Sequence, residues 1–118
     1  MEDLAPEIVR QRLVIEGYYT TTFSAEELKE FMAGLAEMLG MTIIYGPNVM
    51  DIARQHDPKQ AGYEAVMVWA ESGSQIYVWE VYKFFTVDIY TCKAFEPQVA
   101  IDAVIKFFGA EKFTSKEV

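Results

Sequence analysis

The sequence predicts an α+β fold, a two-layer sandwich in which one mostly antiparallel sheet carries two helices on one face. Short runs rich in β-branched and aromatic residues predominate, and only two segments show the apolar spacing of a helix. Three β-rich runs follow one another between residues 63 and 92. The first two of these are separated by small and polar residues that suit a tight turn.

Each strand is predicted from its residue types and from the turn residues beside it. Residues 13–22 are β-branched and aromatic, and a short strand over 41–45 ends at Gly46-Pro47-Asn48. Polar residues over 51–62, which include the only histidine, His56, indicate a surface loop. The remaining predicted strands are 63–69, 75–79, 84–92 and an edge strand over 111–117.

Two helices are predicted from their ends as well as from their periodicity. Ser24 and Glu27 form a capping-box pattern, and Gly40 supplies a stop. The second helix spans about 97–108, with Pro97 suited to its first turn. The predicted inner faces are Leu28, Phe31, Met32, Leu35 and Leu39 on the first helix, and Val99, Ala103, Val104, Phe107 and Phe108 on the second.

Apolar residues occupy both alternating sets of the strand over 84–92. We therefore expect both faces of the sheet to be covered. Cys92, at the end of this strand, is expected by residue type to be a small buried hydrophobic side chain.

Length and charge exclude several classes of protein. The 118 residues are enough for one domain, 1–118, with a core that needs neither disulfides nor metal. A net charge of −8 argues against a nucleic-acid partner. One cysteine and one histidine cannot form a zinc site within one chain. Without a long apolar segment or a basic leader, we expect a cytoplasmic protein with no membrane partner.

The central strands contain a motif in three parts. Glu71-Ser72 begins it, a strand ending in Trp79 follows, and Val87-Asp88-Ile89-Tyr90-Thr91-Cys92 closes it. This ungapped pattern resembles the prokaryotic S-adenosylmethionine decarboxylases. The surrounding strands and helices fit the layout of that family over nearly the whole chain.

The resemblance implies a pyruvoyl cofactor made from the chain itself. Ser72 would attack the Glu71 carbonyl, and cleavage between Glu71 and Ser72 would leave a pyruvoyl group derived from Ser72. That group acts as an electron sink when CO₂ leaves the substrate. Cys92 would return a proton to the substrate carbon. The resemblance further implies an S-adenosylmethionine-like substrate, a role in spermidine and polyamine synthesis, and a homodimer with the active site at its interface.

The chain departs from the family pattern at several of these positions. Tyr77 replaces the processing histidine, and Glu64 falls where a processing serine is expected. Gly73 follows the Glu-Ser pair in place of a histidine, and Trp79-Glu80 replaces Trp-Pro-Glu. We therefore take Tyr77 as a third candidate catalytic residue, and Glu64, Gly73, Trp79 and Glu80 as candidate substrate-binding residues.

Three functions follow from these residues. The first is a self-processing decarboxylase that uses Ser72 and Cys92. The second is an uncleaved, non-catalytic relative that binds a nucleoside-like or amino-acid ligand or regulates a true decarboxylase. The third is a different enzyme on the same scaffold, which would use Tyr77, Glu64 and Cys92 without cleavage.

Overall fold

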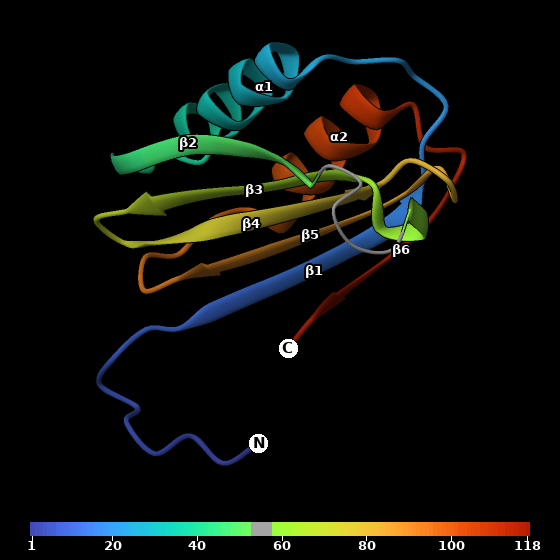
Figure 1. Cartoon of the computed structure of the whole chain (residues 1–118). Helices are drawn as coiled ribbons and strands as arrows, with labels where there is room; N and C mark the ends of the chain where they lie inside the picture. The colour runs from blue at the N-terminus through green and yellow to red at the C-terminus, as the bar shows by residue number, and fades with distance from the viewer. Residues whose placement is uncertain (53–57) are drawn as a thin grey trace.

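A computed structural model describes residues 1–52 and 58–118. This part of the chain forms a six-stranded sheet and two α-helices (Figure 1). In chain order the elements are β1 (Gln11–Tyr18), α1 (Ala25–Met38), β2 (Ile43–Ile52), the short 3-10 helix η1 (Pro58–Gln60), β3 (Gly62–Trp69), β4 (Ser72–Trp79), β5 (Phe84–Thr91), α2 (Pro97–Phe108) and β6 (Lys112–Glu117).

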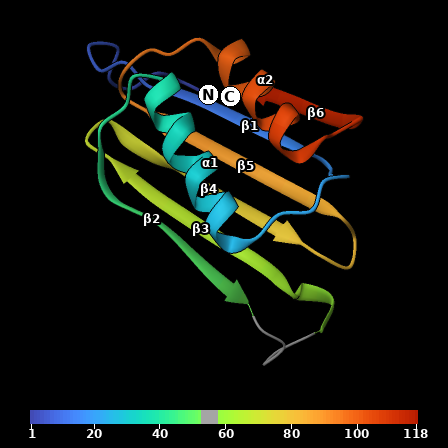
Figure 2. The same ribbon diagram turned by 90° about the horizontal axis from the view of Figure 1, so that it is seen from above.

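The strands lie in the order β2-β3-β4-β5-β1-β6, and every neighbouring pair is antiparallel. Hairpin connections link β2 through β5, whereas β1 and β6 join the other edge of the sheet from the two ends of the chain. Both helices cover the same face (Figure 2). The predicted α+β two-layer architecture is confirmed.

The helix ends follow the predicted chemistry. Ser24 Oγ accepts a hydrogen bond from the Glu27 amide, and the Glu27 carboxylate accepts one from the Ser24 amide. Helix α2 begins at Pro97 and ends before Gly109, whose φ of 59° is the left-handed conformation that glycine adopts readily. Both helices therefore start and stop where their capping residues direct.

The core lies between the helices and one face of the sheet. Phe108 of α2 stacks on Phe85 of β5 with ring centroids 4.0 Å apart, and both side chains are fully buried. Phe31 of α1 stacks on Phe107 of α2 at 4.3 Å. Burial of side chains of this size is the main stabilising contribution to such a fold.

The structure corrects several predicted boundaries and burials. The first strand ends at Tyr18, β2 continues to Ile52, and β4 begins three residues early at Ser72. Val99 is exposed instead of facing the core. Cys92 is exposed, because it follows the last paired residue of β5. Residues 58–62 of the predicted loop are described, but His56 lies outside the described residues.

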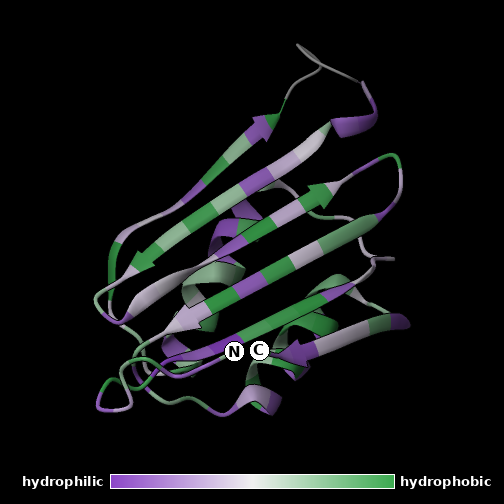
Figure 3. Cartoon of the chain, turned by 90° about the horizontal axis from the view of Figure 1, so that it is seen from below, coloured by the Kyte–Doolittle hydropathy of each residue, from purple (hydrophilic) through white to green (hydrophobic). Residues whose placement is uncertain are grey.

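The second face of the sheet is not covered by the helices (Figure 3). The expectation that both faces are covered is therefore wrong for the single chain. Alternation along each strand places a mixture of aliphatic, aromatic and charged side chains on this face, which we call the open face. Its residues include Arg12, Val14, Glu16 and Tyr18 of β1; Glu64, Val66 and Val68 of β3; Gly73, Gln75, Tyr77 and Trp79 of β4; Phe84, Thr86, Asp88 and Tyr90 of β5; and Lys116 of β6.

Candidate functional site

The Glu71–Ser72 peptide lies in a tight connection between two central strands. Only Ala70 and Glu71 separate β3 from β4, and Ser72 is paired with Trp69 on one side and Thr91 on the other. The φ angle of Ser72 is +140°, a conformation that side-chain-bearing residues rarely adopt. Such a backbone conformation costs about 1–3 kcal/mol and persists only where the surroundings enforce it. Backbone strain is therefore located at the Glu71–Ser72 peptide, which the sequence motif identifies.

The backbone of Cys92 contacts the Glu71–Ser72 peptide. Its amide donates a hydrogen bond to the carbonyl oxygen of Glu71 at 2.8 Å. The thiol is exposed at the same end of the sheet. The structure thus brings together Glu71, Ser72 and Cys92, three of the residues that the sequence motif selected.

The Glu71 side chain is bound as well. Its Oε1 accepts a hydrogen bond from the backbone amide of Thr42 at 3.0 Å, in the segment that joins α1 to β2. This bond holds the pKa of the Glu71 carboxyl below its ordinary value, and the nearby Lys93 ammonium acts in the same direction. Glu71 is therefore ionised and engaged at neutral pH.

Glu64 and Tyr77 form a second cluster, on the open face. Tyr77 Oη donates to Glu64 Oε1 at 2.6 Å, and Gln75 Nε2 donates to the same oxygen at 3.2 Å. The bond to Glu64 raises the pKa of the Tyr77 phenol above its usual 10. At neutral pH Tyr77 is thus a neutral donor whose proton is committed to Glu64, and it is not suited to act as a base.

The two clusters are separate within one chain. Ser72 and Tyr77 lie five residues apart on β4, which corresponds to about 17 Å at the rise of an antiparallel strand. Glu64 pairs in register with Tyr77, so it lies at the same distance from Ser72. A single chain in this conformation therefore cannot use Ser72 together with Tyr77 or Glu64 at one site.

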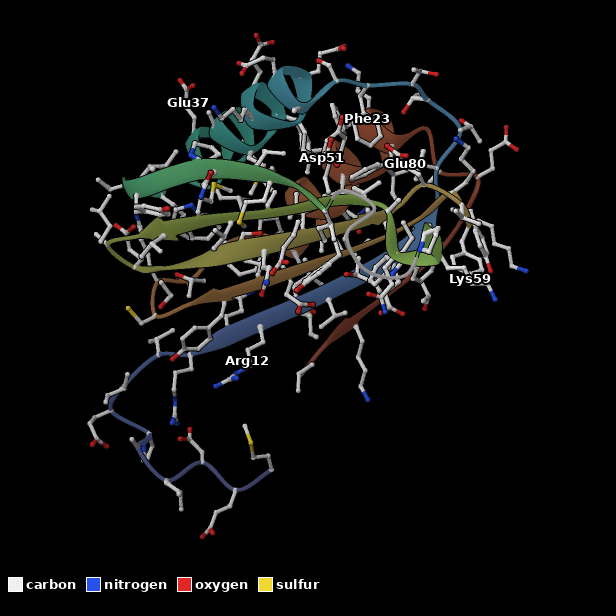
Figure 4. All side chains as sticks on the ribbon, viewed as in Figure 1. Arg12, Phe23, Glu37, Asp51, Lys59 and Glu80 are labelled. Carbon is white, nitrogen blue, oxygen red and sulfur yellow. The ribbon has the colours of Figure 1, made fainter. Side chains whose placement is uncertain are left out.

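Trp79, Glu80 and Gly73 occupy three different surroundings. Trp79 stacks on Tyr77 with ring centroids 5.4 Å apart and extends the second cluster. Glu80 lines a small cavity of about 110 Å³ with Tyr19 and Lys83, on the side of the sheet that bears the helices (Figure 4). Gly73 instead lines a larger cavity beside Ser72. The four candidate substrate-binding residues therefore do not form one pocket in the single chain.

The larger cavity lies on the open face and has a volume of about 750 Å³. Its aliphatic floor includes Val14 and Val66, and its polar wall contains Arg12, Asp88 and Gln75 in addition to Ser72 and Gly73. The Arg12 guanidinium lies over the Tyr90 ring at 4.5 Å, on the side of the sheet away from the helices (Figure 4). The sequence motif did not select Arg12 or Tyr90. These residues lie on different strands, and strand alternation shows that they share a face only once the pairing register of the two strands is known.

Residues 1–52 and 58–118 contain neither a membrane-spanning helix nor a cluster of metal-binding side chains. Neither α-helix in this range has the length and apolar character needed to cross a membrane. The same range contains no group of three or more histidine, cysteine, aspartate or glutamate side chains arranged to hold a metal ion.

Comparisons with known proteins agree with the motif. Residues 11–118 match the model of the family described as S-adenosylmethionine decarboxylase. S-adenosylmethionine decarboxylase proenzymes from Saccharolobus islandicus strains L.S.2.15 / Lassen #1 and M.16.27 are 37% identical over 57 residues. That match spans 48% of this chain and 47% of each relative, so it covers about half the length of these curated proteins.

The fold has a counterpart among solved structures. The crystal structure of adenosylmethionine decarboxylase from Aquifex aeolicus VF5 superposes with a TM-score of 0.74 at 19% sequence identity. The superposition covers 94% of this chain and 89% of that one. This superposition shows a shared fold. The match of the family model over residues 11–118 shows that the chain belongs to the S-adenosylmethionine decarboxylase family.

Proposed function

We propose that the chain is the precursor of a pyruvoyl-dependent decarboxylase that acts on S-adenosylmethionine or a related amino acid. The observation that carries this proposal is the strained Glu71–Ser72 peptide, whose carbonyl is bound by the Cys92 amide. Family membership supplies the reaction class, and the named relatives are proenzymes. In cells the enzyme would act in the cytoplasm, in polyamine synthesis, without a membrane or nucleic-acid partner.

The chain's own atoms account for each step of self-cleavage. Ser72 Oγ adds to the Glu71 carbonyl carbon, and negative charge develops on the oxygen that the Cys92 amide already binds at 2.8 Å. The C–N bond breaks, the amide becomes an ester, and the proton of Oγ passes to the freed nitrogen. Loss of the Ser72 α-proton and cleavage of the Cβ–O bond then release the Glu71 carboxylate. The dehydroalanine left at position 72 tautomerises to an imine, and water hydrolyses this imine to the pyruvoyl ketone with release of ammonia.

The residues around Ser72 fit the resulting group. The Ser72 backbone lies beside the 750 Å³ cavity, and the exposed Cys92 thiol lies at the same end of the sheet. The pyruvoyl group supplies an electron sink for decarboxylation. Cys92 Sγ donates a proton to the carbon that has lost CO₂, and the cavity excludes part of the bulk water from that carbon.

A homodimer formed through the open face would unite the two clusters. A two-fold axis that lies in the plane between the two facing sheets, perpendicular to the strands, sets the Ser72 end of one chain opposite the Tyr77 end of the other, which one chain cannot do alone. Glu64 of one chain would then accept a proton near Ser72 of the other.

One observation favours a second function. The Tyr77–Glu64 hydrogen bond occupies the two positions at which the family carries its processing residues, and it commits both side chains to each other. An uncleaved relative that binds a nucleoside-like or amino-acid ligand, or that regulates a true decarboxylase, would keep this bond. A different enzyme that uses Tyr77, Glu64 and Cys92 would need the same assembly through the open face.

Release of labelled CO₂ from carboxyl-labelled S-adenosylmethionine tests the proposal. We expect activity that hydroxylamine and borohydride abolish, since both attack a ketone. Ser72→Ala should be inactive, whereas Ser115→Ala, on the exposed edge strand β6, should match the wild type. If no preparation releases CO₂ and the uncleaved chain instead gains thermal stability with the substrate, the ligand-binding function replaces the decarboxylase.

A further inference from the structure

The connection that contains Glu71 is tied to another connection by a reciprocal pair of hydrogen bonds. The Thr42 amide donates to Glu71 Oε1 at 3.0 Å, and the Ala70 amide donates to the Thr42 carbonyl at 2.8 Å. Thr42 belongs to the segment between α1 and β2, twenty-nine residues away in sequence. A side chain next to the marked peptide is therefore bonded to a different part of the fold.

The residues that follow β5 are hydrogen-bonded to the same region of the fold. Lys93 Nζ donates to the Gly40 carbonyl at 2.8 Å, and the Lys93 amide donates to Thr91 Oγ1 at 3.0 Å. Cys92 lies between these anchored residues, and its amide binds the Glu71 carbonyl. Three connections thus meet around one peptide, which is held at its carbonyl oxygen and through the side chain that precedes Ser72.

This arrangement explains how Ser72 can keep a φ of +140°. A strained backbone survives only where its neighbours enforce it. The strands fix the peptide on the Ser72 side through the pairing of Ser72 with Trp69 and Thr91. On the Glu71 side, the carboxylate provides the bond to a separate segment.

We propose that the Glu71 carboxylate is a positioning residue, which holds the Glu71–Ser72 peptide in its strained conformation through the Thr42 amide. In this view Glu71 does more than precede the cleaved bond. The kinetic consequence rests on the proposed function, because it concerns the rate of self-cleavage. The conformational consequence does not, because it concerns the backbone of the uncleaved chain.

The conformational consequence is tested in the Ser72→Ala background, which cannot cleave. The amide-to-α-proton coupling of residue 72 in NMR spectra is small at a φ of +140° and large in an ordinary extended strand. We expect a small coupling with Glu71 present and with Glu71→Gln, whose amide oxygen still accepts the bond. Glu71→Ala should raise it. Glu37→Ala, an exposed glutamate near the end of α1, is the matched control and should leave it unchanged.

The kinetic consequence is measured with Ser72 intact, from the rate at which freshly refolded chain separates into two pieces. We expect Glu71→Ala to slow cleavage by about tenfold, which corresponds to about 1.4 kcal/mol in the barrier. Glu71→Gln should stay within roughly threefold of the wild type, as should Glu37→Ala. Rescue by glutamine separates positioning from a general loss of folding.

The coupling measurement and the cleavage measurement have different refuting outcomes. An unchanged coupling at residue 72 in Glu71→Ala overturns the positioning role, whatever the cleavage rates are. A raised coupling with unchanged cleavage also overturns it as a property of the reaction. If the wild type never cleaves, the proposed function fails, and the coupling alone still decides whether Glu71 sets the backbone of residue 72.

Discussion

Replacing Ser72 by glycine and by alanine measures the strain at the marked peptide. Neither variant can cleave, so both are single chains that unfold as a whole. Alanine keeps a side-chain carbon at a φ of +140°, and glycine removes it. The difference between the two free energies of unfolding therefore isolates the backbone conformation from the loss of the hydroxyl group.

The expected magnitude follows from two opposing effects. Relief of the strained conformation stabilises the glycine variant by about 1–3 kcal/mol. The greater freedom of glycine in the unfolded chain offsets about 0.5–1 kcal/mol of this gain. We expect Ser72→Gly to be about 1 kcal/mol more stable than Ser72→Ala, which corresponds to a melting temperature about 4 °C higher.

Urea denaturation followed by circular dichroism provides the measurement. Ser115 of β6 serves as the matched control, because it is exposed and does not have a positive φ. There the order should reverse, with Ser115→Gly about 0.5–1 kcal/mol less stable than Ser115→Ala. If glycine also destabilises position 72 relative to alanine, Ser72 is not strained and the reasoning about this peptide is wrong.

Three other predictions concern the remaining features. Because the bond to Glu64 raises the pKa of Tyr77, the stability it contributes is present below pH 10 and is lost as the pH rises through the higher folded value. Glu64→Gln should therefore lower the pH at which the tyrosinate absorbance of Tyr77 appears, and an unchanged titration would refute the bond. Cys92→Ala should leave cleavage intact but slow formation of the correctly protonated product by roughly 10²-fold. Full product formation, measured by mass spectrometry, would remove Cys92 as the acid. Phe108→Ala should cost about 3–5 kcal/mol in urea denaturation, since its ring is fully buried against Phe85. A loss below 1 kcal/mol would contradict the described core.

Local signals predicted the helices well. Ser24 with Glu27, and Pro97 with Gly109, specify helix ends through contacts within a few residues, so the sequence contains the whole signal. The start of β4 at Ser72 is different. Small polar residues suggested a longer turn, but pairing with Trp69 and Thr91 extends the strand to Ser72, and that pairing is a property of the sheet.

The candidate site was predictable in part for the same reason. The motif selected Ser72 and Cys92, which the structure joins through the Glu71 carbonyl. It did not reveal that Tyr77 and Glu64 lie about 17 Å from Ser72, because that separation depends on strand length and register. The Glu71–Thr42 bond joins residues far apart in sequence, and no local pattern predicts it.

Intact mass under denaturing conditions is the measurement that tests the central claim most directly. The account predicts two pieces, residues 1–71 and residues 72–118, the second with a ketone in place of its N-terminal amine. Ser72→Ala should give one unbroken chain. A wild-type protein that remains unbroken after prolonged incubation would contradict the pyruvoyl mechanism, and the assignments of Ser72 and Cys92 to catalysis would be withdrawn.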